Sequence, residues 1–208
     1  MHKPYGSYEK YFKRPLDLLC GLLAVIVFWW LYLILIVLGT IFMRGNPFFT
    51  QPRPGKNGKI FKLIKFRSMD NRKDKNGNLL PDEVRLNKYG RLLRKTSLDE
   101  IPEAFNIIKG DMSVIGPRPL LVQYLPLYSE KQRHRHDVRP GVSGYAQVNG
   151  RNSITWTHKF ELDCEYVKKI TFLGDLKILI QTIEKAFIKQ EGISSETSDT
   201  MEDFDGTN

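Results

Sequence analysis

The sequence predicts a mainly α-helical protein with small β elements, an α+β fold. In it, an N-terminal helix hairpin re-enters the membrane and a compact domain lies at the membrane surface. Two observations predict this: an uncharged apolar run from Leu18 to Met43, and a polar, basic remainder whose helical patterns are interrupted by Gly and Pro clusters. We therefore divide the chain into an anchor (residues 1–44), a main domain (45–190) and a tail (191–208).

The apolar run is long enough to cross a bilayer, since a helix of its length extends about 39 Å. It is too long for a signal peptide, and no small-x-small cleavage site follows it. Basic residues stand before it and after it, so the positive-inside rule favours a hairpin that returns to the same side, with a bend near Trp29-Trp30. No proline follows Pro15 within the run, which favours an unbroken span instead. Both topologies stay open, and the charge rule makes re-entry our prediction.

The rest of the chain predicts short elements. Two strands, 49–55 and 58–66, flank a turn at Asn57-Gly58, and a charged surface loop follows at 70–83. Helical patterns cover residues 84–95, 98–109, 119–135, 158–169 and 174–190. Glycine and proline make 137–155 mostly loop or short strand, and the composition after Glu191 is typical of disorder.

The formal net charge of +9 calls for anionic partners, and nucleic acid, anionic lipid headgroups and phosphorylated small molecules all qualify. The apolar run favours the last two, since anionic leaflets attract basic residues beside an anchor. Cys20 and Cys164 are too few for a disulfide framework. No Walker loop, GxGxxG, HExxH or cysteine-ligand pattern occurs, so nothing indicates an ATPase, a dehydrogenase or a zinc enzyme.

The segment from Ser97 to Glu100 has two interpretations. Ser97 and Glu100 fit a helix capping box, and acidic residues suit the positive end of a helix. Alternatively, Asp99 and Glu100 lie among basic residues, where a carboxylate stays ionised and can act as a metal ligand or a nucleophile. Pro102 weakens the first interpretation, because a proline at this point disturbs a helix that begins at Ser97.

Three other segments are candidates for binding. In 110–119, two prolines bracket Arg118, so a rigid turn presents a guanidinium suited to bidentate phosphate binding; a plain turn with a solvated arginine fits equally well. The histidines of 133–141 lack partners for a zinc site, and a basic helix end that meets headgroups or phosphates accounts for them better. The segment 147–152, with Gln147 and Arg151, either lines a nucleotide pocket or is only a loop.

These segments and several shorter stretches follow one another in an order shared with a known family. The stretches are Lys13-Arg14 with Asp17, Phe49-Thr50-Gln51 with Arg53-Pro54-Gly55, Phe61-Lys62 through Lys65-Phe66, Ser97 to Glu100, Gly110 to Ser113, Ile115 to Pro119, Arg135 to Gly141, Gln147 to Arg151, and Thr200-Met201-Glu202 with Phe204 and Gly206. Together they resemble the bacterial sugar transferases, and more narrowly the small monotopic polyprenyl-phosphate phosphoglycosyltransferases. The most similar type is the initiating transferase of bacterial N-linked protein glycosylation. One departure stands out: where the family bends its membrane helix at a Ser-Pro pair, this chain has Trp29-Trp30.

The resemblance implies an enzyme that moves a sugar-1-phosphate from a UDP-sugar, expected to be an N-acetylated amino sugar, to polyprenyl (undecaprenyl) phosphate and releases UMP. It implies that Asp99 and Glu100 form the catalytic pair and bind Mg²⁺, with Asp99 carrying a covalent aspartyl-phosphosugar intermediate. We expect substrate or phosphate binding by Arg118, Arg94, Lys65, Arg151 and Gln147.

The resemblance also implies a place in the bacterial inner membrane, with the catalytic domain facing the cytoplasm and contacting inner-leaflet anionic lipids. Downstream glycosyltransferases are further candidate partners, because this reaction is the first membrane step of glycoconjugate assembly. Two other classes remain open. A non-catalytic membrane-tethered adaptor of the same fold is disfavoured by the intact pair Asp99-Glu100. A nucleic-acid binder lacks aromatic-basic interleaving and any helix-turn-helix pattern, so no nucleic-acid partner is expected.

Overall fold

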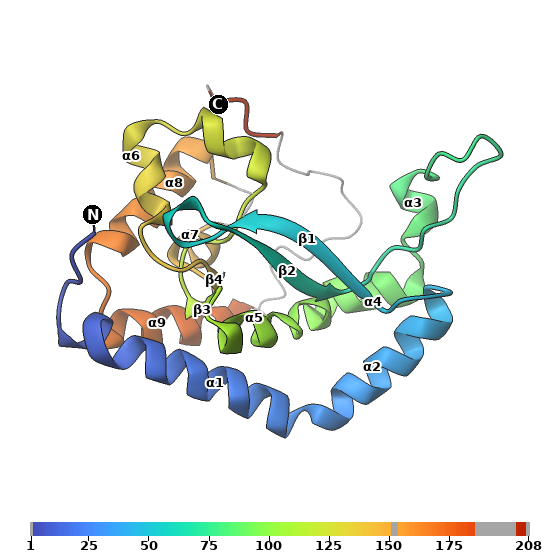
Figure 1. Cartoon of the computed structure of the whole chain (residues 1–208), viewed down its shortest axis with the longest axis horizontal. Coiled ribbons are helices and arrows are strands. Elements are labelled where there is room, and N and C mark those ends of the chain that lie inside the picture. The colour runs from blue at the N-terminus through green and yellow to red at the C-terminus, as the bar shows by residue number, and fades with distance from the viewer. Residues whose placement is uncertain (1, 151–153, 186–202, 207–208) are drawn as a thin grey trace.

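The computed structural model describes residues 2–150, 154–185 and 203–206 (Figure 1). Its α-helices are α1 (Lys13–Val27), α2 (Trp29–Phe42), α3 (Asp82–Arg85), α4 (Lys88–Thr96), α5 (Glu103–Lys109), α6 (Glu130–Arg133), α7 (Tyr145–Val148), α8 (Trp156–Lys168) and α9 (Phe172–Ile183). Its strands are β1 (Phe48–Pro54), β2 (Ile60–Phe66), β3 (Ser113–Ile115) and β4 (Gly141–Ser143). A π-helical turn, Tyr8–Phe12, precedes α1, and 3₁₀ turns occur at Lys56–Gly58, Leu98–Glu100, Val122–Leu127 and His134–His136. The α+β prediction is confirmed.

The predicted hairpin is present. β1 and β2 pair in antiparallel fashion from Phe48 opposite Phe66 to Pro54 opposite Ile60. The turn between them contains Asn57 at φ 57° and Gly58 at φ 73°, the left-handed conformation that these two residue types tolerate best. The prediction of this hairpin from its turn residues is therefore confirmed.

A second sheet, of β3 and β4, was not predicted. The two strands run parallel, with Ser113 opposite Gly141 and Ile115 opposite Ser143. A Cβ on Gly141 would lie 2.1 Å from the main-chain nitrogen of Gly116, so this close approach requires glycine. Each strand has only three residues, too few to show an alternating pattern. β3 lies in a segment that was interpreted as a turn, and β4 lies in one that was predicted to be mostly loop or short strand.

The apolar run forms two helices rather than one. The chain is helical from Lys13, leaves the helix at Phe28 (φ −101°, ψ 16°) and continues in α2. The predicted bend near Trp29-Trp30 therefore occurs, although no proline is involved. None of the described helices is by itself long and apolar enough to cross a bilayer. Among them, only Tyr8–Val27 and Trp29–Phe42, counted together, have the length and hydropathy of a membrane span, and this pair is bent by 65°.

Polar groups of α1 attach it to the main domain. Asp17 is 5% exposed and accepts hydrogen bonds from the Ser113 hydroxyl (2.5 Å) and the Val114 amide (2.9 Å). Arg14 donates to the main-chain oxygens of Ile107 and Ile108, which lie in the last turn of α5. These bonds hold one half of the bent pair against β3 and α5.

The second half, α2, is attached at other points. The Tyr32 hydroxyl donates to the main-chain oxygen of Ile101 (2.7 Å), and the Tyr89 hydroxyl donates to that of Leu35 (3.2 Å). Gly39 lets α2 approach the chain that follows it, since a Cβ there would lie 2.8 Å from the Cβ of Pro47. The two halves are thus bound to separate parts of the domain, and these bonds fix the bend.

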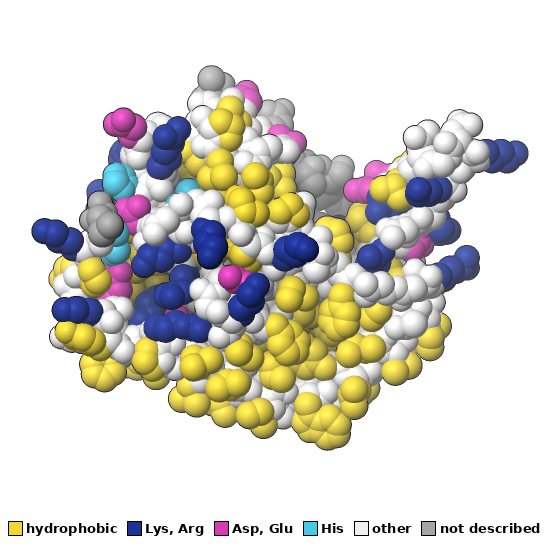
Figure 2. Space-filling view, viewed as in Figure 1, with side chains coloured by type: hydrophobic (Ala, Val, Ile, Leu, Met, Phe, Trp, Pro, Cys, Tyr) yellow, Lys and Arg dark blue, Asp and Glu magenta, His cyan; other side chains and the backbone are white. Residues whose placement is uncertain are grey.

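The outer side of the bent pair is apolar. Figure 2 shows hydrophobic side chains along the border formed by α1 and α2 in Figure 1. At the bend, Ile26 and Trp29 are 64% and 60% exposed. α9 is tied to α1 by the ion pair of Lys13 and Asp175 (2.5 Å) and also exposes large apolar side chains, namely Phe172, Leu173, Leu176, Leu179, Ile180 and Ile183. A broad apolar surface is therefore exposed on these helices.

Three predicted helices are interrupted. The 84–95 pattern becomes α3 and α4, with a new start where the Asn87 side chain accepts a bond from the Gly90 amide (2.9 Å). The 98–109 pattern divides at Pro102 into a 3₁₀ turn and α5. The prediction of one helix over 119–135 was wrong, because Pro126 lies in a 3₁₀ segment and Ser129 caps the separate helix α6.

The last two predicted helices are present as α8 and α9. Both begin two residues earlier than predicted, where the threonines Thr155 and Thr171 accept cap bonds from main-chain amides. The end of the 174–190 prediction and most of the tail lie outside the described residues. Within the tail, however, Phe204 is 3% exposed and packed among aromatic rings, so disorder after Glu191 does not describe this segment.

Candidate active site

Glu100 is the centre of a charged cluster. It lies in the 3₁₀ turn after α4, whose end at Ser97 adopts φ 54°. The interpretation of Ser97 and Glu100 as a helix capping box was wrong, because the Ser97 side chain makes no cap hydrogen bond. The Glu100 oxygen Oε1 instead accepts hydrogen bonds from Lys65 Nζ and Arg118 Nη2, both at 2.7 Å.

Lys65 is shared between two carboxylates. Besides Glu100, its Nζ lies 3.2 Å from Oε1 of Glu103, whose side chain is 3% exposed. Asn106 fixes this arrangement by pairing with one edge of the β2 backbone: its Oδ1 accepts from the Ile64 amide (3.0 Å), and its Nδ2 donates to the Lys62 oxygen (2.8 Å). α5, which carries Glu103, is thereby locked against β2, which carries Lys65.

The carboxyl groups of the cluster have different proton affinities. Burial opposes ionisation of Glu100, but Arg118 and Lys65 outweigh it and hold its pKa at about 2. Burial, and then the negative charge of Glu100, raise the pKa of Glu103 to about 7. The same two causes raise the pKa of Asp99 above its ordinary value, against the opposing effect of Lys65 and Arg118.

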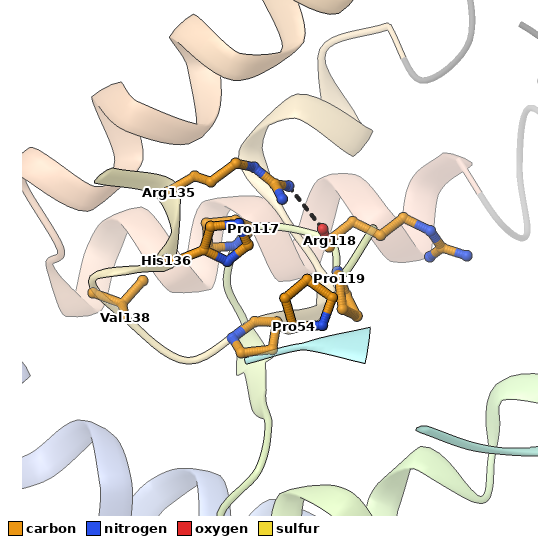
Figure 3. Close-up of a pocket in the computed structure, with 8 residues that line it drawn as sticks. Pro54, Pro117, Arg118, Pro119, Arg135, His136 and Val138 are labelled. Atoms are coloured by element: carbon orange, nitrogen blue, oxygen red, sulfur yellow. Dashed lines mark hydrogen bonds between the residues drawn. The ribbon is translucent and has the colours of Figure 1, made fainter. Parts of the chain in front are cut away.

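Arg118 sits on the rigid turn that the two prolines predict. Pro117 and Pro119 line a pocket together with Pro54 and His136 (Figure 3). The main-chain oxygen of Arg118 accepts a hydrogen bond from Arg135 Nη2 (2.7 Å) on this side, while its guanidinium points away from the pocket. The guanidinium thus projects from the turn and binds Glu100, and its binding of a phosphate stays a prediction.

A further arginine adds positive charge. Arg53, near the end of β1, donates from Nη2 to Gln51 Oε1 (2.7 Å), but its Nε is buried without a hydrogen-bond partner in the described part of the chain. Burial, and then the nearby charge of Arg118, lower the pKa of the Arg53 guanidinium. A buried donor beside a second cation is a favourable place for an anion.

Two other predicted binding residues, Arg94 and Gln147, make their printed contacts elsewhere in the described part of the chain. Arg94 is exposed and donates from Nε to the Ser68 hydroxyl (2.9 Å); among the described residues it forms no ion pair with Asp99 or Glu100. Gln147 lies in α7, where its amide donates to the Val142 oxygen (3.1 Å). Arg151 lies outside the described residues.

A metal ion at this site would find few protein ligands. In the described ranges, no three His, Cys, Asp or Glu side chains come together as a metal site. Mg²⁺ commonly uses one or two carboxylates plus substrate phosphates and water, so the pair Asp99 and Glu100 with a bound diphosphate has the right donor chemistry. The two cations on Glu100 share a single oxygen, Oε1.

Several residues of the site were missed by sequence reasoning. Glu103 was treated as an ordinary helical residue, and Asp163, which binds Arg135, was not singled out. Acidic residues in a helix are usually solvated, and nothing in their local sequence marks these two as buried. Arg53 was counted as a basic flank of the anchor and as part of a matching stretch. Its buried Nε is visible only in three dimensions.

Comparison with known proteins gives consistent results. The model of a family described as bacterial sugar transferase matches residues 8–189. The sugar transferase EpsL of Bacillus subtilis (strain 168) is 56% identical over 164 residues, which cover 78% of this chain and 81% of EpsL.

Two relatives are named for their reactions. A UDP-glucose:undecaprenyl-phosphate glucose-1-phosphate transferase of Klebsiella pneumoniae is 35% identical, with 90% of this chain and 42% of the relative covered. An N-acetylgalactosaminephosphotransferase of Aeromonas hydrophila, named for UDP-N-acetylgalactosamine and undecaprenyl phosphate, is 34% identical, with 83% and 43% covered. This chain spans less than half the length of these two proteins. The extent of the family match and the similarity to EpsL confirm the resemblance seen in the motifs: this chain belongs to the bacterial sugar transferase family.

Proposed function

We propose that this protein transfers a sugar-1-phosphate from a UDP-sugar to undecaprenyl phosphate and releases UMP. One observation carries the proposal: Asp99 adjoins Glu100, which Lys65 and Arg118 bind at a single oxygen. The charge of Arg118 in turn acts on Arg53, whose buried Nε has no hydrogen-bond partner among the described residues. The names of the Klebsiella and Aeromonas relatives support the same substrates.

The reaction proceeds in two displacements at one phosphorus atom. An oxygen of the Asp99 carboxylate attacks the sugar-bearing phosphate of the UDP-sugar; a bond from this oxygen to phosphorus forms, and the bond to the bridging oxygen breaks. The bridging oxygen leaves with its electron pair on UMP. An oxygen of undecaprenyl phosphate then attacks the same phosphorus, and Asp99 leaves as a carboxylate, so the product is an undecaprenyl diphosphate sugar.

The cations of the cluster lower the cost of bringing anions together. Phosphoryl transfer depends mainly on positioning and on neutralising charge. The Arg118 side chain is 42% exposed and still reaches Glu100, so it can bind a substrate phosphate while it stays in the cluster. Arg53 supplies a second guanidinium. Burial makes Asp99 a stronger base than an exposed aspartate, and Lys65 and Arg118 favour its ionised form.

Asp99 and Glu100 would hold Mg²⁺ together with the diphosphate of the substrate. When bound, the ion supplies additional neutralisation of phosphate charge. In the structure, Lys65 and Arg118 hold Glu100 as a carboxylate, the form needed for such a role. The division of labour between Asp99 and Glu100 follows from this difference: the strongly paired Glu100 binds cations, and Asp99 provides the attacking oxygen.

The second substrate explains the apolar surface. Undecaprenyl phosphate keeps its tail in lipid, and we infer that α1 and α2 enter the inner leaflet as a bent pair and return to the cytoplasmic side. The exposed apolar tip at Ile26 and Trp29 and the basic residues at both ends of the pair support this topology. The transferred sugar stays a prediction: we expect an N-acetylated amino sugar, for which the Aeromonas relative is named, whereas the Klebsiella relative is named for glucose.

The activity is tested by incubating the purified protein in detergent with individual UDP-sugars, Mg²⁺ and undecaprenyl phosphate, and by measuring UMP. We expect UMP release that depends on the lipid for turnover. Without the lipid, a single burst of UMP and a mass increase of one sugar phosphate on Asp99 should appear. A folded protein that releases no UMP from any UDP-sugar favours the non-catalytic adaptor.

Topology is tested by labelling single cysteines from outside intact cells. Cysteines are placed at positions 3 and 57 of a variant that lacks Cys20 and Cys164. Re-entry predicts that both positions stay unlabelled until the membrane is permeabilised. Labelling of position 3 alone means that the segment spans the bilayer.

A further inference from the structure

A second arginine, fully buried, holds the main chain of Arg118. The side chains of Arg135 and Asp163 are 1% and 3% exposed. Both Nε and Nη2 of Arg135 donate to Oδ2 of Asp163, at 3.0 and 2.7 Å. The same Nη2 donates to the main-chain oxygen of Arg118 (Figure 3). The residue whose guanidinium binds Glu100 is thus fixed from behind by an ion pair that water does not reach.

Aromatic rings enclose this ion pair. The guanidinium carbon of Arg135 lies 5.7 Å from the ring centroid of Tyr128 and 5.5 Å from that of Phe160. Phe204, from the C-terminal segment, stacks on Tyr128 at 5.8 Å and packs edge-on against Phe160 at 5.0 Å. Excluding water strengthens the bonds of a buried polar group and makes the loss of any one of them costly.

The C-terminal segment is bound to the chain that follows the Arg118 turn. The Tyr124 hydroxyl donates to Asp203 Oδ1 (2.8 Å), and the ring of Tyr124 packs edge-on against Phe204 at 5.7 Å. Tyr124 lies in the 3₁₀ segment Val122–Leu127, which begins four residues after Arg118. Phe204 therefore touches both structures that support the turn: this segment and the enclosure of Arg135.

We propose that Phe204, Arg135 and Asp163 are positioning residues for Arg118, and that docking of the C-terminal segment sets the place of its guanidinium. This inference rests on the proposed function, in which Arg118 binds a substrate phosphate. All three side chains are buried, so we expect their effect on the reaction to pass through Arg118. Misplacement of a binding group by about 1 Å can cost roughly 100-fold in rate, which makes such support important.

The test is a double-mutant cycle of Phe204→Ala and Arg118→Lys in the full-length protein, measured as kcat for UMP release with the UDP-sugar that the wild type uses best. In the wild-type background, Phe204→Ala should lower kcat by about tenfold, because Arg118 is less well placed. In the Arg118→Lys background, where the fork is already lost, the same change should lower kcat by less than about twofold. Equal losses in both backgrounds would overturn the proposal.

A matched control separates positioning from stability. Leu162 lies on α8 with Phe160 and Asp163 and is 8% exposed, but it is not part of the aromatic cluster. Leu162→Ala should lower the unfolding temperature and leave kcat within about twofold of the wild type when assayed well below that temperature. If it lowers kcat as much as Phe204→Ala does, the effect is a general loss of stability and the proposal fails.

Two more variants keep the test decisive if Phe204→Ala does not fold. Phe204→Leu retains an apolar side chain and should keep most of the activity. Asp163→Asn weakens the hold on Arg135 and should lower kcat in the wild-type background but not in the Arg118→Lys background. An active wild type with additive losses overturns only the positioning role. A wild type that releases no UMP overturns the proposed function itself.

Discussion

Two clusters of arginine and carboxylate lie on opposite sides of the Arg118 turn, and they differ in how fully their charges are satisfied. In the inner cluster, Arg135 and Asp163 are almost inaccessible, and the arginine divides its bonds between Asp163 and a main-chain oxygen. In the outer cluster, Lys65 serves two carboxylates, and the side chains of Glu100 and Arg118 are 19% and 42% exposed.

The difference indicates what each cluster does. A buried ion pair is costly to break, so the inner cluster can hold a conformation. An accessible cluster is poised for a charged ligand when it has shared cations, two carboxyl groups of raised pKa and a buried donor, Arg53 Nε, that no described residue binds. Four predictions test this contrast.

The largest effect is expected in the outer cluster, at Asp99. Asp99→Asn replaces the attacking oxygen with an amide and should lower UMP release by roughly 10³-fold or more. The fold should persist, because a neutral side chain is easier to bury than the carboxylate, whose pKa burial already raises. UMP release measures the activity, thermal unfolding measures whether the fold persists, and flotation with vesicles measures membrane binding. Near-normal turnover would show that Asp99 is not the nucleophile.

The next effect separates the two clusters by stability. Asp163→Asn breaks the inner ion pair and should cost about 3–5 kcal/mol of unfolding free energy, because it leaves Arg135 buried without its counter-charge. Glu100→Gln should cost much less stability but most of the activity. Thermal unfolding followed by tryptophan fluorescence in detergent gives the comparison. Equal destabilisation by the two variants would contradict the proposed division between holding and binding.

A smaller loss is expected from Arg118→Lys. The charge remains, but the planar fork is lost, so kcat/KM should fall by about 10–100-fold with little change in unfolding temperature. Arg91→Lys is a suitable control, since Arg91 is exposed on α4 and donates to the Leu86 main-chain oxygen. Unchanged kinetics in Arg118→Lys would mean that this arginine only supports the turn.

The smallest effect concerns pH and Glu103. Because the folded protein holds the pKa of Glu103 at about 7, above that of an exposed glutamate, the folded state binds the extra proton. Stability from this group is therefore present at low pH and is lost as pH rises through about 7. The unfolding temperature of Glu103→Gln should match the wild type near pH 5 and exceed it near pH 8. A difference that does not grow with pH would show that Glu103 ionises normally.

The sequence predicted the parts of the fold that local interactions determine. The β1–β2 hairpin followed from its turn residues, and the Arg118 turn from its prolines. The break at Phe28 has a different origin, because Asp17 and Tyr32 bind separate parts of the domain that are distant in the chain. Likewise, the aromatic cluster around Phe204 and the proline at 126 overrode the helical pattern of 119–135.

The site, too, was predicted only where the local sequence carries the information. Asp99, Glu100, Lys65 and Arg118 carry motif information, and the structure brings the last three into direct contact. Arg94 shared their basic surroundings in the sequence, yet its place on α4 directs it to Ser68. The partner of Arg135 is 28 residues away on another helix, and no local pattern identifies such a pairing.

The attachment of α1 has a consequence for how the chain is made. Ser113, a partner of Asp17, is 96 residues further along, and Asp175, the partner of Lys13, is 162 residues further along. At roughly 5–20 residues per second, the ribosome needs about 5–20 s to reach Ser113 once Asp17 has been made. Throughout that interval Asp17 and Lys13 lack these partners, and an unpaired charge is costly to bury. α1 therefore completes its native contacts only late in synthesis, after residue 175 has left the ribosome.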